Sequence, residues 1–251
     1  MLAARRNLVI VGGGLAAVVL AAWAWQVNMS LQMQAAANSA SAWQWTPGVI
    51  VATVLMWCVM MVAMMLPTAT PFIWTYWNLA GNRSTHTSRT GGTIAFVFGY
   101  LVAWTIFSAI ATALQMLLDE RGLLSPNMAI VATGLSGVVV LAAGVYQFTP
   151  MKSACAHKCR TPIGFFMARW RDGAGGATAV GIAHGAYCIG CCWMLMATMF
   201  VMGVMSLAWM AILTAIMLVE KLPSMGERFG RILGWIGIAT GIALIAKSFA
   251  S

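Results

Sequence analysis

The sequence predicts an all-α protein, a polytopic bundle of about seven transmembrane helices. Hydrophobic residues make up 61% of the 251-residue chain and charged residues only 8%. Mean hydropathy is +0.86, and apolar runs of span length alternate with short polar connections. A soluble domain of this size would need more polar surface. We therefore expect residues 1–251 to form a single transmembrane domain whose principal partner is the lipid bilayer.

Seven spans are expected, and only the first has a rival interpretation. They cover about residues 8–25, 48–66, 93–117, 127–148, 177–203, 207–222 and 232–248. The first run could instead be a cleaved signal peptide, because Ala40-Ser41-Ala42 resembles a cleavage site, and six spans would then remain. That motif lies about 15 residues beyond the end of the run. We therefore expect the first helix to be retained.

The second span carries sulfur side chains and should end at Pro67. Met56, Met60 and Met64 recur at helical spacing, with Cys58 beside them. Methionine is adaptable packing material, and its thioether also binds Cu(I). We expect packing to be the main role of this stripe and keep Cys58, Met60 and Met64 as candidate ligands.

The third span leads to a short acidic connection at 119–122, and the fourth delivers the chain to its most basic segment, 150–176. That segment contains Cys155, His157 and Cys159. On a helix, Cys155 and Cys159 would face the same way, four positions apart. The spacing alone is a weak metal signal, but it precedes a stronger one by about 25 residues.

The fifth span contains the strongest functional signal, the stretch Gly181 to Met196. Its polar members include one histidine and three cysteines, namely His184, Cys188, Cys191 and Cys192. At about 100° per residue, Cys188 lies about 40° from His184 and Cys191 about 20° the other way, so the three share a helix face. Cys192 lies about 80° around the helix axis from His184. Imidazole with thiolates suits copper, zinc or iron–sulfur chemistry.

Helix geometry limits how this face could hold an ion. His184 and Cys191 are separated by roughly 10 Å along the axis, so a straight helix cannot place both on one ion. A mononuclear site would use Cys188 with either Cys191 or His184 and take further ligands from elsewhere. Two neighbouring ions are the other arrangement. The alternative without a metal is that the cysteines are small packing residues.

The sixth span ends at Glu220-Lys221, before Pro223. A carboxylate inside a membrane is functional by default. Glu220 could also reach the headgroups or pair with Lys221, and the sequence does not choose between these outcomes.

Basic residues predict the orientation of the chain. With a cytoplasmic N-terminus, all 14 Lys and Arg residues except Arg121 and Lys247 fall on the cytoplasmic side. This satisfies the positive-inside rule, with the C-terminus outside. The same rule explains the basic excess without nucleic acid as a partner.

The predicted depths of these residues in the membrane suggest two sets of further ligands that could join Cys188. Cys188 and Cys58 each lie near the predicted midplane, so Cys58 with Met60 and Met64 could complete the site. The rival set is Cys155, His157 and Cys159, folding back onto His184. The sequence leaves both open.

These residues resemble the DUF2182 family, bacterial membrane proteins labelled as predicted metal-binding. The resemblance covers most of the chain and rests on Met64-Met65-Leu66-Pro67, 146–152, Cys155, Cys159-Arg160-Thr161-Pro162, Trp170, Gly181, 184–193, 203–205, Trp209-Met210 and Glu220-Lys221. Ser206 departs from the pattern, which has asparagine there. The resemblance implies a bacterial inner-membrane protein that binds a metal, with no established reaction.

We expect a membrane metal-binding protein, most simply for copper, that acquires, delivers or stores it. Thiolates, thioethers and one histidine form a soft ligand set that favours Cu(I), with zinc and iron as alternatives. A metalloenzyme or redox subunit of a membrane complex is a second hypothesis, although no motif supports a specific reaction. A thiol–disulfide oxidoreductase using Cys188 and Cys191 is a third. A helical packing subunit is a fourth.

Overall fold

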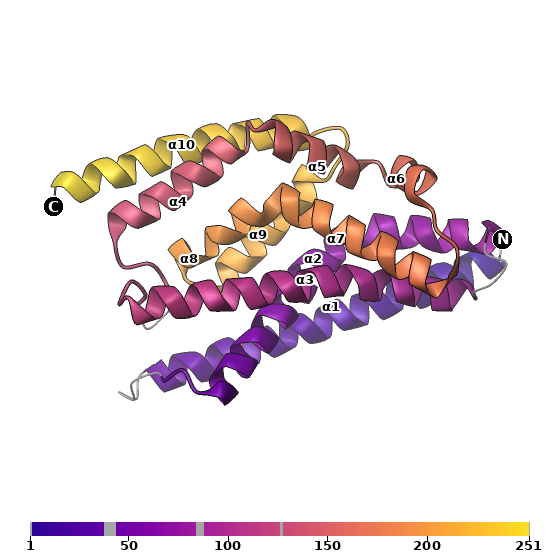
Figure 1. Ribbon diagram of the computed structural model, residues 1–251, viewed down its shortest axis with the longest axis horizontal. Helices are drawn as coiled ribbons and strands as arrows, with labels where there is room; N and C mark the ends of the chain where they lie inside the picture. Colours follow the sequence, from indigo (N-terminus) through magenta and orange to yellow (C-terminus); the bar gives the residue numbers. More distant parts are fainter. Residues whose placement is uncertain (1, 38–43, 84–87, 126–127, 251) are drawn as a thin grey trace.

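The computed structural model describes residues 2–37, 44–83, 88–125 and 128–250, and these form a helical bundle. Its longest helices run roughly along the long axis of the molecule (Figure 1). The all-α prediction is confirmed. In chain order the helices are α1 (Leu2–Ala37), α2 (Pro47–Arg83), α3 (Arg89–Glu120), α4 (Thr133–Tyr146), α5 (Pro150–Arg160), α6 (Pro162–Arg169), α7 (Gly173–Ala197), α8 (Met199–Met202), α9 (Leu207–Glu220) and α10 (Gly226–Ala250).

Five segments of the described chain are long and apolar enough to cross a membrane: Gly12–Gln32, Pro47–Gly81, Arg89–Glu120, Gly173–Met202 and Gly226–Ala250. A sixth arises if α4 and α5, which meet at a bend of 63°, are taken as one broken span. The predicted sixth span corresponds to the shorter apolar helix α9. The candidate cleavage motif at 40–42 lies outside the described residues. These helices fit a multi-pass membrane protein.

Helix α2 does not end at Pro67 as expected but continues through Pro67 and Pro71. Proline removes one backbone donor from a helix, so Pro67 leaves the carbonyl of Ala63 without its usual partner. The indole Nε1 of Trp23 in α1 donates to that carbonyl at 3.2 Å. Substitute donors of this kind let helices continue past proline inside a membrane.

Close contact between α3 and α7 fixes the position of the cysteine-rich helix. A Cβ added at Gly99 would lie 2.1 Å from the carbonyl oxygen of Thr178, and one at Gly181 would lie 2.1 Å from that of Phe96. The two backbones can approach this closely only because both positions are glycine. Gly185 continues the same contact, against Ala103. The buried face of α7 is therefore held against α3.

Helices α4 and α10 form a second close pair, which lies side by side at one edge of the bundle (Figure 1). A Cβ added at Gly144 would lie 2.6 Å from the backbone nitrogen of Ile238. Helix α9 begins after Ser206, whose hydroxyl accepts a hydrogen bond from the backbone N–H of Trp209 at 3.3 Å. Serine and asparagine cap helices about equally well, so serine suits this position.

Candidate metal centre

Cys188 stands at the centre of the polar groups inside the bundle. It is 0% exposed. Its Sγ lies 2.9 Å from the ammonium nitrogen of Lys221, which follows α9, and 3.3 Å from the hydroxyl of Tyr100 in α3. The same ammonium donates to Thr68 in α2 at 2.6 Å. Four helices therefore meet around one sulfur.

Three more thiols surround Cys188. They belong to Cys159, Cys191 and Cys192. Cys159 comes from α5, and its Sγ lies 4.0 Å from that of Cys191. The thiols of Cys191 and Cys192 both donate to the backbone carbonyl of Cys188, at 3.0 and 2.9 Å. We call these four cysteines the thiol cluster.

A small void lies beside two members of the thiol cluster. A void of about 10 Å³ is lined by Ala156, Cys191, Cys192, Met217, Glu220 and Lys221. That volume is about the minimum for a single water molecule. Two sulfurs bound to one ion at about 2.3 Å each are at most about 4.6 Å apart, so the 4.0 Å separation of Cys159 and Cys191 falls within reach of a shared ion.

The described residues do not present a finished ligand shell. Across 2–37, 44–83, 88–125 and 128–250, no three His, Cys, Asp or Glu side chains are already grouped to hold an ion. Two thiols instead face a carbonyl, and Lys221 faces Cys188.

His184 lies one turn before Cys188 in an aromatic enclosure. Its ring stacks on Phe72 with centroids 3.8 Å apart, and Phe165 meets it edge-on at 5.6 Å. It is 1% exposed. Within the described structure, neither of its ring nitrogens has a hydrogen-bond partner. Buried polar groups without partners are uncommon and call for an explanation, such as an ion.

The remaining predicted ligands are dispersed. Cys155 lies against Gly190, where an added Cβ would be 2.8 Å from its Sγ, and His157 is exposed. Cys58 is half-buried, 4.0 Å from the Thr105 hydroxyl in α3. Met60 and Met64 are buried in the hydrophobic core. Of the two predicted partner sets, the one from α5 supplies Cys159 to the cluster.

Glu220 neither pairs with Lys221 nor reaches outward, two of the outcomes that the sequence left open. Both of its carboxylate oxygens accept from the ammonium of Lys152 in α5, at 2.9 and 2.8 Å, and it is 6% exposed. Gln147 donates to it at 2.9 Å. Glu220 therefore pairs with α5, whereas Lys221, the next residue, contacts Cys188 of α7.

Sequence reasoning did not assign Lys221, Tyr100 or Thr68 to the site. Lys221 carried little signal, since a lysine at the end of an apolar span ordinarily extends to the membrane interface. Tyr100 and Thr68 carried none, because one tyrosine and one threonine in apolar helices are unremarkable. Their proximity depends on how α2 and α3 pack against α7.

Together, the fold and the thiol cluster define a helical protein of membrane type with a buried group of sulfur donors. Over residues 54–244 the chain matches the PpoB2 family, described as a copper chaperone. The match covers most of the chain, which therefore belongs to this family. No curated protein and no solved structure matches it.

Proposed function

We propose that this protein is an integral membrane copper chaperone that takes up Cu(I) as cargo at the thiol cluster and passes it on. The observation that carries this proposal is the convergence of thiols from α5 and α7 on a fully buried Cys188. Thiolates are the soft ligands that select Cu(I). The copper description of the family and the resemblance to DUF2182 point the same way.

Lys221 supplies a charge argument for a monovalent ion. In low dielectric, uncompensated charge is costly. Two thiolates with Cu(I) carry one net negative charge, which the Lys221 ammonium balances. Zn(II) would need three thiolates to reach the same net charge, and it prefers four ligands. Lys221 therefore matches a two-thiolate Cu(I) site, while the preference for copper rests on the soft donors.

The ligand assignment within this proposal starts from Cys188. Cys191 and Cys159 are the candidates for the second thiolate, because both interact with Cys188 and their own sulfurs lie 4.0 Å apart. Cys192 is an alternative donor on the same helix, and His184 offers two free ring nitrogens one turn away. Cys155, Cys58, Met60 and Met64 would act during entry or exit of the ion.

The test is Cu(I) binding to purified protein, measured by competition with a chromogenic Cu(I) chelator. We expect stoichiometric copper on the wild type and at least a tenfold loss of affinity for Cys188→Ser and Cys159→Ser. Cys58→Ser is the matched control, because Cys58 lies against α3 rather than among the clustered thiols. Equal affinity for all four proteins would refute the site.

Burial argues against a thiol–disulfide oxidoreductase. Exchange needs an accessible thiolate, whereas Cys188 and Cys191 are 0% and 5% exposed. All six cysteines are free. A redox subunit that uses the same ligands is distinguished by turnover with quinol, which a chaperone would lack. We place the chaperone in the bacterial inner membrane with its N-terminus in the cytoplasm, as the basic connections indicate.

A further inference from the structure

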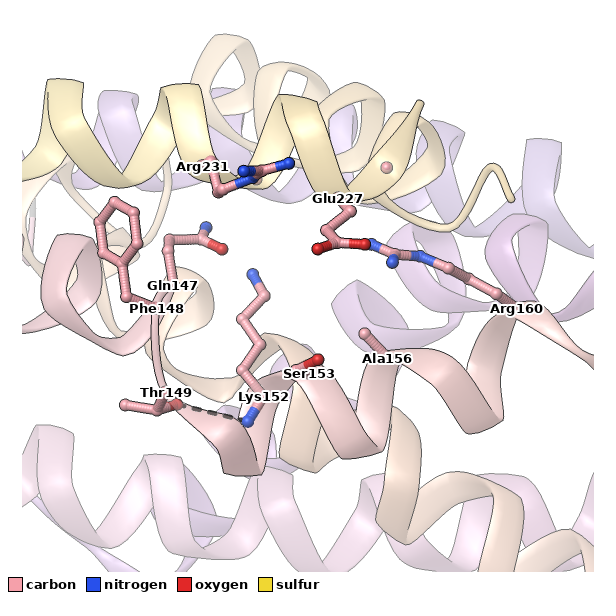
Figure 2. A pocket seen from close by; sticks show the side chains of 11 residues that line it. Gln147, Phe148, Thr149, Lys152, Ser153, Ala156, Arg160, Glu227 and Arg231 are labelled. Atoms are coloured by element: carbon pink, nitrogen blue, oxygen red, sulfur yellow. Dashed lines mark hydrogen bonds between the residues drawn. The ribbon is translucent and has the colours of Figure 1, made fainter. Parts of the chain in front are cut away.

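Two cavities lie end to end along α10 and share Gln147. The first, about 180 Å³, lies between α5 and α10, with charged side chains on both walls (Figure 2). The second, about 300 Å³, lies deeper, between the α4/α10 pair and helices α7, α8 and α9. We propose that the two cavities together hold one anionic phospholipid, with its phosphate in the first and an acyl chain in the second.

The walls of the first cavity favour an anion. Lys152 points into it from α5, Arg231 lies along its α10 wall, and Arg160 enters from the end of α5, with Glu227 as the acidic residue of the lining (Figure 2). The charge of Lys152 is offset by Glu220 at 2.8 Å. Arg160 donates through Nε to the backbone carbonyl of Glu220, which fixes the guanidinium in place. The charged side chains that line the cavity therefore carry a net positive charge.

Two helix N-termini reinforce this preference. Helix α5 begins at Pro150 and α10 at Gly226, and the first turns of both line the cavity. Unpaired backbone N–H groups and the helix dipole make such ends favourable for anions. Here they act alongside the guanidinium groups of Arg160 and Arg231 rather than alone.

The second cavity would hold the acyl chain of the lipid. No charged side chain lines it, and its wall on α10 runs from Leu233 to Leu244. At about 1.5 Å per residue this is roughly 16 Å of apolar wall. It begins where the charged lining of the first cavity ends, at Arg231. Basic pockets between transmembrane helices are a known type of site for anionic headgroups.

Native mass spectrometry of the full-length protein, titrated with phosphatidylglycerol or phosphatidylcholine, tests the proposal. We expect the wild type to bind phosphatidylglycerol about fivefold more tightly, and Arg231→Gln to remove that preference. Arg228→Gln is the matched control, because it removes the same charge from α10 at a residue that does not line the cavity. Unchanged copper binding by Arg231→Gln would show that the variant is folded.

A second pair of variants tests the second cavity, which is proposed to hold the acyl chain. Val140→Phe fills it, whereas Val138→Phe adds the same bulk at a position that is 52% exposed. We expect only Val140→Phe to lower phosphatidylglycerol occupancy. Equal losses for Arg231→Gln and Arg228→Gln would mean general surface attraction and overturn the proposal. So would displacement of the lipid by equimolar inorganic phosphate, or equal occupancy in the two valine variants.

Discussion

In the proposed site, the side chains around Cys188 divide into those that would bind the ion and one that would balance its charge. The sulfurs of Cys159, Cys191 and Cys192 are the proposed ligands, and the ammonium of Lys221 is the proposed counter-charge. Tyr100 is anchored elsewhere, because its hydroxyl donates to the carbonyl of Met65 at 3.1 Å. Each proposed role can be tested by a substitution that removes one chemical property, such as charge, and keeps the size of the side chain.

Replacing Lys221 with methionine removes the charge and keeps the length of the side chain. Without the ammonium, a Cu(I) ion on two thiolates leaves one uncompensated charge in low dielectric. We expect Lys221→Met to weaken Cu(I) binding at least tenfold, about 1.4 kcal/mol or more. Chelator competition measures this, with the exposed Lys158→Met as control. Unchanged affinity would remove Lys221 from the site.

The contributions of the ring shape of His184 and of its two ring nitrogens can be tested separately. In His184→Phe, a phenyl ring can stack on Phe72 in the same way and carries no unpartnered nitrogen. We expect the metal-free protein to gain on the order of 1 kcal/mol in stability, while its affinity for copper falls. Thermal unfolding and copper competition are measured together, with the exposed His157→Phe alongside. A stabilised variant with unaltered copper affinity would make His184 a packing residue.

At the scale of elements, the site depends on how closely α7 approaches α3. An added Cβ at Gly181 would meet the carbonyl oxygen of Phe96 at 2.1 Å, so backbone must shift. We expect Gly181→Ala to lower stability by about 2 kcal/mol or more and to disturb copper binding with it. Gly175→Ala, on the same helix with open space around it, should be harmless. Thermal unfolding in detergent compares the two, and equal midpoints would contradict the close contact.

Helix α9 shows why sequence reasoning found the cysteines but not their partners. The helical period alone placed Cys188 and Cys191 on one face, and the two do lie together in the cluster. The partner of Glu220 lies 68 positions away and that of Lys221 lies 33 away. Those pairings depend on where α9 stops relative to α5 and α7. That point is set by packing among helices, for which local periodicity carries no signal.

At the scale of the whole molecule, composition was sufficient for the fold class but not for helix ends. Low charge content and long apolar runs predicted a helical bundle. The expected stop at Pro67 was wrong, because Trp23 from a different helix supplies the donor that proline lacks. The fourth span was expected from residue 127, whereas α4 begins at Thr133 after an isolated bridge between Leu124 and Ile130.

The orientation of the molecule is a prediction at the same scale. The basic segment 150–176 should face the cytoplasm and the end of α10 should face outward. Alkaline phosphatase is active only outside the cytoplasm. We therefore expect a fusion after Ser251 to be active and one at Lys158 to be inactive. The reverse pattern would invert the topology.

The carbonyl of Cys188 accepts from two thiols at once, and this has a spectroscopic consequence. If Cys191 and Cys192 turn toward an ion, as the proposed site requires, that carbonyl loses both thiol donors, keeps only its helical N–H partner, and its double bond stiffens. Its infrared absorption should then move to higher frequency. An isotope label on this single peptide group would thus report occupancy directly from the main chain, without a coloured probe.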